Sequence, residues 1–260
     1  MLGAITGDIF GAAYEWNAQK IEDFDLFAKR RFFTDDTVLT VATADALLGD
    51  GDFRKAYHLW GRRYPDAGYG ARFLQWLSSD QPQPYSSFGN GSAMRVSPIG
   101  WFYDDLDAVL AAAAESAVVS HNHEEGIKGA QATALAVFLA RTTHDKTIVR
   151  GEISVRFDYD LARTVDGIRP DYAFDVSCQG TVPEAIICFL DSHSYEDAVR
   201  NAISLGGDSD TLACITGAIA EAFYGPVPPE IETLVRESLT PDLLEILDAF
   251  YKRYPGVQHD

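Results

Sequence analysis

The segment Leu2-Gly3-Ala4-Ile5-Thr6-Gly7-Asp8-Ile9-Phe10-Gly11 mixes apolar residues with three glycines spaced four residues apart. Residues at this spacing lie about 40° apart around a helix, so the glycines share one side of a helix that we predict over residues 2–15. Each glycine costs an exposed helix about 1 kcal/mol relative to alanine. Their physical use is to let another backbone approach closely, and we expect a second chain segment against this side.

Two carboxylates belong to the same segment. Asp8 and Glu15 are seven residues apart and would share one helix face, two turns apart. A carboxylate at the end of a buried helix needs a cation or hydrogen-bond donors. Glu15 is therefore a candidate functional residue.

Two further acidic clusters open predicted helices, Thr34-Asp35-Asp36-Thr37 and Gly206-Gly207-Asp208-Ser209-Asp210-Thr211. Two carboxylates about 4 Å apart repel by about 4 kcal/mol at an effective dielectric constant near 20. A fold tolerates such a pair at a helix N-terminus, beside a cation, or with one group protonated. Each cluster alone is therefore compatible with simple helix capping, in which Thr34 caps its helix and the acids complement the dipole.

Together the clusters indicate a metal centre. Carboxylates and hydroxyls are hard oxygen ligands, which suit Mg²⁺ or Mn²⁺ better than zinc or copper. The Gly206-Gly207 pair can adopt positive φ and turn the following side chains inward. If the two clusters meet in the fold, they supply enough ligands for a two-metal hydrolase.

Helical periodicity dominates the rest of the chain. Alternating patterns typical of strands are scarce, and the best one, over residues 153–159, is short and broken by charges. No linker divides the sequence, so residues 1–260 are predicted to form one all-α domain. The helices are expected at 2–15, 35–48, 52–64, 69–78, 91–101, 105–119, 123–141, 145–155, 181–191, 195–205, 210–224, 229–238 and 241–252.

Two other motifs carry polar chemistry. The segment Ser86–Arg95 contains a glycine-bracketed turn, and at a helix start such a turn presents N–H groups to a phosphate, although a bare turn with a cap has the same pattern. The segment His121-Asn122-His123-Glu124-Glu125 also opens a predicted helix. Zinc is disfavoured there because no second Cys or His cluster lies nearby, which leaves substrate contact and helix capping.

Composition excludes several classes of function. The formal net charge is −18, so the basic surface of a nucleic-acid-binding protein is absent and an anionic membrane would repel the chain. No run approaches the roughly 18 apolar residues of a membrane span, and the N-terminus lacks a signal-peptide pattern. Three cysteines are an odd number and favour reduced thiols, so a cytoplasmic protein is expected.

Five motifs occur in one order: Gly7-Asp8…Gly11…Glu15, Thr34-Asp35-Asp36-Thr37, Gly89-Asn90-Gly91-Ser92-Ala93-Met94-Arg95, Ser120-His121…His123, and Gly207-Asp208-Ser209-Asp210-Thr211. Together they resemble the ADP-ribosylglycohydrolases, over residues 1 to about 225. The resemblance implies a compact all-α orthogonal bundle with two Mg²⁺ or Mn²⁺ ions in a cleft. It also implies hydrolysis of the bond between ADP-ribose and an acceptor, so the partner would be an ADP-ribosylated protein or a small-molecule ADP-ribose conjugate.

The resemblance also implies residue roles. Thr34, Asp35 and Asp36 would bind one ion, Asp208 and Thr211 the other, and Asp210 would bridge them. Glu15 would be a mobile carboxylate beside the second ion, and either Glu15 or Asp36 would act as the catalytic acid–base. The ADP-ribose cleft would be lined by Gly70, Ser87, Phe88, Gly89, Asn90, Gly91 and His121.

The acceptor is not determined by these motifs. An arginine linkage is our first expectation and a serine linkage the second. Two alternatives stay open: a non-catalytic relative that binds ADP-ribose or blocks a toxin, and a different binuclear metallohydrolase such as a phosphoesterase.

Overall fold

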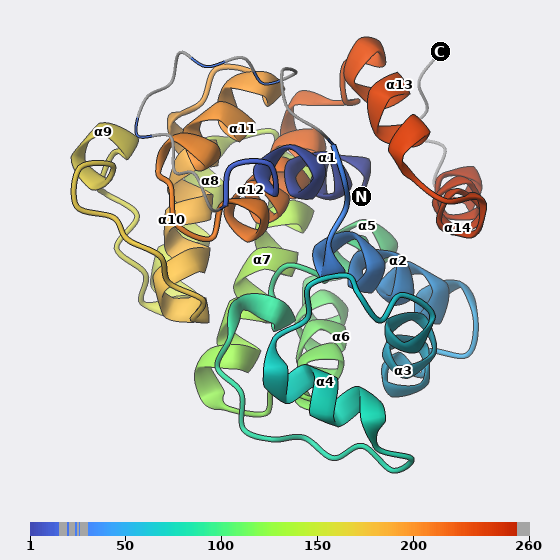
Figure 1. Cartoon of the computed structure of the whole chain (residues 1–260). Coiled ribbons are helices and arrows are strands. Elements are labelled where there is room, and N and C mark those ends of the chain that lie inside the picture. The colour runs from blue at the N-terminus through green and yellow to red at the C-terminus, as the bar shows by residue number, and fades with distance from the viewer. Residues whose placement is uncertain (16–19, 21–23, 25, 27–30, 254–260) are drawn as a thin grey trace.

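The computed structural model describes residues 1–15, 20, 24, 26 and 31–253 (Figure 1). Within this part the chain is helical, and its only β-type pairing is an isolated bridge between Gly89 and Ser177. The all-α prediction is confirmed. The elements are α1 (Leu2–Gly11), α2 (Asp35–Leu48), α3 (Phe53–Arg63), α4 (Ala71–Ser78), the 3₁₀ turn η1 (Asn90–Ser92), α5 (Ser97–Phe102), α6 (Leu106–Val118), α7 (Glu124–Thr143), α8 (Lys146–Phe157), α9 (Val165–Ile168), α10 (Cys178–Asp191), α11 (Tyr195–Ser204), α12 (Ser209–Tyr224), α13 (Pro229–Ser238) and α14 (Pro241–Arg253).

The glycines of α1 let this helix pack directly on the backbone of α12 (Figure 1). A Cβ added at Gly7 would lie 1.9 Å from the carbonyl oxygen of Ala213, and one at Gly11 would lie 2.3 Å from that of Ser209. No side chain fits in such a gap. The expected close approach of a second backbone is therefore confirmed, and the partner is a helix about 200 residues away in sequence.

Two helices organise the remaining layers. Helix α7 packs against α5, α6, α8, α10 and α12, and most of its residues from Gly129 to Ala140 are buried. Helix α2 packs against α1, α3, α5 and α14. Because α1 contacts both α2 and α12, it brings the N-terminal ends of those two helices to the same region of the fold.

Several boundaries differ from the prediction. Helix α1 ends at Gly11, and residues 12–15 form turns. The predicted helix 91–101 is divided into η1 and α5, and Pro98, which lacks an N–H, lies in the first turn of α5. The strand candidate at 153–159 is wrong, since α8 continues to Phe157. Helix α10 begins at Cys178, earlier than expected, because the Ser177 side chain caps it.

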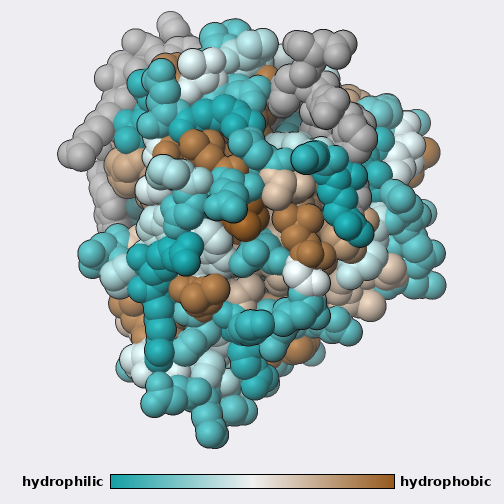
Figure 2. All heavy atoms as spheres, turned by 90° about the vertical axis from the view of Figure 1, so that its right-hand side faces the viewer, coloured by the Kyte–Doolittle hydropathy of each residue, from teal (hydrophilic) through white to brown (hydrophobic). Residues whose placement is uncertain are grey.

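The surface is mainly hydrophilic on the face shown in Figure 2, where hydrophobic residues form small separate groups. None of the helices in the described residues combines the length and the apolar character that crossing a membrane requires. Cys178, Cys188 and Cys214 are buried and form no disulfide.

Candidate active site

Asp8 organises the start of α2. Its buried carboxylate accepts hydrogen bonds from the backbone N–H groups of Thr34 and Thr37, each at 3.0 Å, and from the hydroxyls of both threonines, that of Thr34 at 2.7 Å. Thr34 also caps α2, because its side chain accepts from the Asp36 N–H. The predicted cap is confirmed, and Asp35 and Asp36 occupy the first turn. Asp8 thus fixes the turn that presents both acids.

The two acidic clusters meet. The Thr211 hydroxyl at the start of α12 donates to Asp36 Oδ2 at 3.4 Å, across 175 residues of sequence. Burial, followed by the negative charge of Asp210, raises the pKa of Asp8, Asp35, Asp36 and Asp208, so Asp210 lies within electrostatic reach of all four. Asp210 therefore occupies a central position among carboxylates from α1, α2 and α12.

Glu15 joins the same group. Ligand atoms of Glu15, Asp208 and Asp210 all lie within 4.8 Å of one another. Glu15 does not reach them through the seven-residue helical spacing, because α1 ends at Gly11 and Glu15 lies in the turn that follows. The side chain is half-buried, whereas Asp208 and Asp210 are buried. The backbone turn, and not a shared helix face, places Glu15 at the cluster.

The Gly206–Gly207 pair turns the chain into this cluster. The φ angles are +71° and +78°, as the sequence predicted. A Cβ at Gly207 would lie 3.0 Å from the Tyr172 ring and 3.1 Å from the Ala173 carbonyl oxygen. The left-handed backbone favours glycine at position 207, and these tight contacts add to that preference. The turn ends at Asp208, the residue before α12.

The five aspartates of this region have no basic partner among the described residues. No Lys or Arg of that part of the chain forms an ion pair with Asp8, Asp35, Asp36, Asp208 or Asp210. Burial, followed by the charge of Asp210, raises the pKa of Asp8 to about 7 and that of Asp208 to about 9. The same causes raise the pKa of Asp35 and Asp36 well above the usual value of an aspartate.

These residues fit a divalent metal. Asp36 Oδ1 is buried and has no hydrogen-bond partner in the described structure. The surrounding donors are carboxylate and hydroxyl oxygens, which Mg²⁺ and Mn²⁺ prefer. A cation would satisfy the orphaned oxygen and offset the repulsion between the carboxylates. The group Glu15, Asp208 and Asp210 can therefore hold a metal ion. Asp36 is linked to the same end of α12 by the hydrogen bond from Thr211.

The glycine loop Ser87–Gly91 adjoins the cluster through Asn90. The Asn90 side-chain amide donates to Asp208 Oδ2 at 2.6 Å and to Thr181 Oγ1 at 3.1 Å. The sequence predicts that this loop opens an α-helix directly. The structure differs, because the 3₁₀ turn η1 follows instead. Two of its N–H groups are used within the protein, that of Gly89 by the Ser87 hydroxyl and that of Asn90 by the Val176 carbonyl. A phosphate bound at this loop would therefore need other donors.

Hydrophobic side chains flank the same loop. Phe88, Phe174 and Val176 are each about half exposed, whereas most described valine side chains are buried and most described phenylalanines are buried or partly buried. The Cys178 N–H donates to the Phe88 carbonyl, and the Asn90 N–H donates to that of Val176, so the two segments run together. An exposed apolar rim thus lies beside a polar loop, an arrangement suited to a ligand with an aromatic base and a charged group.

The two histidines have different roles. His123 caps α7, since its Nδ1 accepts from the Glu125 N–H at 3.1 Å. His121 is buried, and its Nδ1 lies 2.8 Å from the Ser120 hydroxyl. Its Nε2 faces the glycine loop, because a Cβ at Gly91 would lie 3.3 Å from that nitrogen. His121 is therefore placed to contact a ligand of the loop.

A third segment, Gly68–Gly70, borders Asp35. A Cβ at Gly68 would lie 3.5 Å from Asp35 Oδ1. The Tyr69 hydroxyl is buried without a hydrogen-bond partner in the described structure, and burial followed by the charge of Asp35 raises its pKa. Gly70 is exposed before α4. This loop thus brings an unused hydroxyl close to the acidic cluster.

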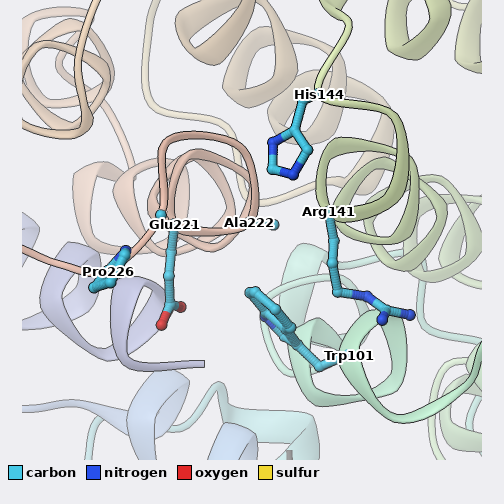
Figure 3. Close-up of a pocket in the computed structure, with 7 residues that line it drawn as sticks. Trp101, Arg141, His144, Glu221, Ala222 and Pro226 are labelled. Carbon is cyan, nitrogen blue, oxygen red and sulfur yellow. The ribbon is translucent and has the colours of Figure 1, made fainter. Parts of the chain in front are cut away.

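A small cavity elsewhere is separate from this site. It has a volume of about 110 Å³ and is lined by Trp101, Arg141, His144 and Glu221, among others (Figure 3). Ligand pockets usually have volumes of about 300–1,000 Å³. Glu221 is eleven residues beyond Asp210 on α12, a distance of about 16 Å along the helix axis. The cavity is therefore too small and too distant to be the active site.

Sequence reasoning missed two site residues. The sequence assigns no role to Asp8, because a carboxylate on a helix face has the same sequence pattern whether or not it holds a loop. Tyr69 belongs to a short glycine-flanked segment, and its closeness to Asp35 depends on tertiary packing. A signal for Asp8 was available in its position within an otherwise apolar helix, where a charge needs donors.

Known proteins share this architecture. The family model described as ADP-ribosylglycohydrolase matches residues 1–260. The mouse protein ADP-ribosylhydrolase ARH3 is 27% identical, with 86% of this chain and 82% of the relative aligned. ADP-ribosylarginine hydrolase Tri1 of Pseudomonas putida is 26% identical, with 88% and 71% aligned.

A solved structure described as an ADP-ribosylglycohydrolase-related protein complex superposes with a TM-score of 0.71 at 25% identity. The superposition covers 92% of this chain and 96% of the chain in that solved structure. The match of the family model over the whole chain, the relatives and the shared fold lead to one conclusion. This chain belongs to the ADP-ribosylglycohydrolase family.

Proposed function

We propose that this protein removes ADP-ribose from an ADP-ribosylated acceptor in a reaction assisted by two Mg²⁺ or Mn²⁺ ions, with ADP-ribosyl-arginine as the preferred substrate. One observation carries the proposal: buried Asp36, Asp208 and Asp210 come together with half-buried Glu15, and Asn90 links this group to the glycine loop. Membership of a hydrolase family supports the reaction class. Residues 1–260 would act as one domain.

The ligand assignment follows from the donors. We assign Thr34, Asp35 and Asp36 to one ion and Asp208 and Thr211 to the other. Asp210 would be shared, and its electrostatic reach to all the neighbouring aspartates supports this role. Thr34 already donates to Asp8 and accepts from the Asp36 N–H, so only one lone pair of its hydroxyl is left for an ion.

Bound divalent ions would supply positive charge that orients the ribose hydroxyls and lowers the pKa of a water molecule. Departure of the acceptor from C1″ develops oxocarbenium character on the distal ribose, as in other glycoside cleavages. Buried carboxylates beside that ribose stabilise the developing positive charge. The carboxylates of the cluster would therefore stabilise the charge of the transition state as well as hold the ions.

Proton transfer is assigned to Glu15. Its side chain is half-buried and Glu15 lies in a turn, so it can exchange protons with solvent. Asp36, the other candidate, is buried in the first turn of α2 and accepts the hydrogen bond of Thr211. A general base must reach the proton that it removes and must then exchange that proton with solvent. Both requirements favour Glu15.

Substrate binding is assigned to the loop and its rim. Gly91 and His121 would contact the diphosphate, and Phe88 would contact the base. The hydrogen bond from the Asn90 side chain to Asp208 would connect these loop groups to the carboxylates beside the reacting ribose. Gly70, Ser87 and Gly89 remain proposed cleft residues. The partner would be an ADP-ribosylated protein or a smaller ADP-ribose conjugate.

The proposal is tested with arginine-, serine- and nucleotide-linked ADP-ribose substrates, each assayed for free ADP-ribose with Mg²⁺, Mn²⁺ or EDTA. We expect release from the arginine conjugate with a metal and none with EDTA. Asp210→Asn should abolish release, whereas Asp80→Asn, an exposed carboxylate remote from the cluster in sequence, should not. ADP-ribose binding without release from any conjugate would favour the non-catalytic alternative, and phosphate release from a generic ester would favour the phosphoesterase.

A further inference from the structure

Arg95 is a buried charge without an acidic partner. Its side chain is fully buried, and none of the ion pairs among the described residues involves it. The guanidinium stacks on Tyr57, with Cζ 4.1 Å from the ring centroid. Nε and Nη1 have no hydrogen-bond partner in the described structure. Burial of an arginine without an acidic partner is unfavourable, so the few contacts that its guanidinium makes are informative.

The remaining contacts of Arg95 lead to His121. Arg95 Nη2 donates to the Ser116 carbonyl at 2.8 Å and to the Ser120 hydroxyl at 3.1 Å. The Ser120 hydroxyl in turn lies 2.8 Å from His121 Nδ1. All three side chains are buried. Arg95, Ser120 and His121 therefore form a continuous hydrogen-bonded chain that ends beside the glycine loop.

The direction of each hydrogen bond is determined by its donors. A guanidinium can only donate, so Ser120 Oγ must accept from Arg95. The Ser120 proton is then available, and His121 Nδ1 is the only other hydrogen-bond partner of that oxygen among the described residues. If Nδ1 carried a proton, the buried Ser120 hydroxyl would be left without an acceptor. Nδ1 therefore accepts, and in a neutral imidazole the proton is on Nε2.

Nε2 is directed at the candidate phosphate loop. A Cβ at Gly91 would lie 3.3 Å from it and a Cβ at Gly89 would lie 3.7 Å away. The N–H groups of Gly89 and Asn90 are already used within the protein. A ligand at this loop therefore lacks two of the backbone donors that the motif suggests, and an imidazole N–H would replace one of them.

We propose that Arg95 and Ser120 are positioning residues that hold His121 as the Nε2–H tautomer, so that it donates a hydrogen bond to a phosphate oxygen of ADP-ribose. This inference rests on the proposed function for the identity of the ligand. The groups facing His121 are Arg95, Arg72 and the ring of Tyr85. Burial, followed by the charges of the two arginines, lowers the pKa of His121 and keeps it neutral.

The tautomer is measured directly by ¹⁵N NMR on the whole protein without ligand. We expect the His121 Nδ1 signal to be that of an unprotonated nitrogen and the Nε2 signal to be that of a protonated one. In Ser120→Ala this preference should weaken. In Ser116→Ala it should persist, because Arg95 uses the backbone carbonyl of Ser116, and the lost hydroxyl bonds only Ala113. A proton on Nδ1 in the unmodified protein would overturn the proposal, whatever the variants do.

Binding of ADP-ribose, measured by calorimetry, tests the consequence. Ser120→Ala should raise Kd about tenfold, the effect of one lost well-placed hydrogen bond. In a His121→Ala background the same substitution should change Kd less than about twofold, because residues that act through one another are not additive. An equal effect of Ser120→Ala in both backgrounds would show that it acts through structure alone and would refute the chain. Circular dichroism confirms that each variant is folded.

The two proposals fail in different ways. If the unmodified protein does not bind ADP-ribose, the proposed function is wrong, but the tautomer experiment still decides whether Arg95 and Ser120 position His121. If ADP-ribose binds and Ser120→Ala binds it as well as the unmodified protein does, the proposed function stands and the positioning role is refuted.

Discussion

Replacement of Gly7 with alanine should destabilise the protein and disturb the acidic cluster, because the new Cβ has no space. An ideal Cβ at this position would lie 1.9 Å from the carbonyl oxygen of Ala213 and 2.6 Å from the backbone nitrogen of Cys214. Real Cβ contacts are essentially never shorter than 3.0 Å, and the obstructing atoms are backbone. Helices α1 and α12 must therefore separate by about 1 Å or rotate against each other.

The expected cost follows from that displacement. Overpacking of a core costs about 1–3 kcal/mol, and a clash with backbone belongs at the upper end. The higher helix propensity of alanine returns at most about 1 kcal/mol. The net loss of about 2 kcal/mol in the free energy of unfolding lowers Tm by about 4–8 °C in a chain of this size.

Gly151→Ala is the matched control. Gly151 lies within α8 and is exposed, and no atom lies within 4 Å of the position that its Cβ would occupy. The same chemical change should therefore raise the free energy of unfolding by about 0.5–1 kcal/mol through helix propensity. Opposite signs for the two variants would show that the approach of the α12 backbone, and not the loss of glycine as such, destabilises Gly7→Ala.

The site should respond as well. Asp8 directly follows Gly7, and Ala213 lies on the helix that carries Asp210, so any separation of α1 from α12 changes the spacing of the carboxylates. Urea unfolding measures the stability, and thermal shift with increasing Mg²⁺ measures metal binding. We expect a weaker Mg²⁺ response in Gly7→Ala and an unchanged one in Gly151→Ala. A Gly7→Ala protein with unaltered stability and Mg²⁺ response would refute the packing argument.

Three other outcomes are expected. Mg²⁺ or Mn²⁺ at one hundred times its Kd should stabilise the fold by about 2.7 kcal/mol and so raise Tm by about 5–10 °C. A Tm that changes with neither ion nor with EDTA would contradict the metal site. Because burial and the charge of Asp210 raise the pKa of Asp208 to about 9, the folded protein without metal binds more protons than the unfolded chain between about pH 4 and 9. The contribution of Asp208 to the free energy of unfolding should therefore be lost as pH rises across that window. Metal affinity should increase over the same range, because the carboxylates lose their protons. A metal affinity that falls with pH in calorimetric titrations would be inconsistent with binding to these carboxylates. Asp210→Asn should leave the metal-free Tm unchanged or higher, since it removes a repelling charge. It should also abolish the increase in Tm that Mg²⁺ causes, whereas Asp80→Asn should retain that increase. A large loss of metal-free stability in Asp210→Asn would mean that Asp210 has a structural role.

Local chemistry made part of this structure predictable. The spacing of Gly3, Gly7 and Gly11 predicts a close helix contact, and the structure supplies α12 as the partner. The Thr34 cap and the positive φ angles of Gly206 and Gly207 also follow from residue type. Each of these features depends on interactions within a few residues or on the space beside one backbone, which sequence patterns report well.

Features that depend on distant segments were not accessible in the same way. Asp8 serves Thr34 and Thr37, and nothing in the pattern of α1 names those partners. The glycine loop gives two N–H groups to Ser87 and Val176, so its resemblance to a free phosphate-binding turn was incomplete. Glu15 reached the predicted cluster for a reason other than the expected one, since the helix ends before it. Tertiary packing decided each case.

Helix geometry explains how the fold tolerates so many carboxylates in one place. Asp35 and Asp36 lie in the first turn of α2, while Asp208 precedes α12 and Asp210 lies in its first turn. Each helix N-terminus carries about half a positive charge and stabilises a nearby anion. Two such ends directed at one cluster offset part of the repulsion before any ion binds, and the four hydrogen bonds to Asp8 offset more. These contacts lower the cost of folding without metal, and the negative charge that they leave uncompensated would favour the binding of a cation.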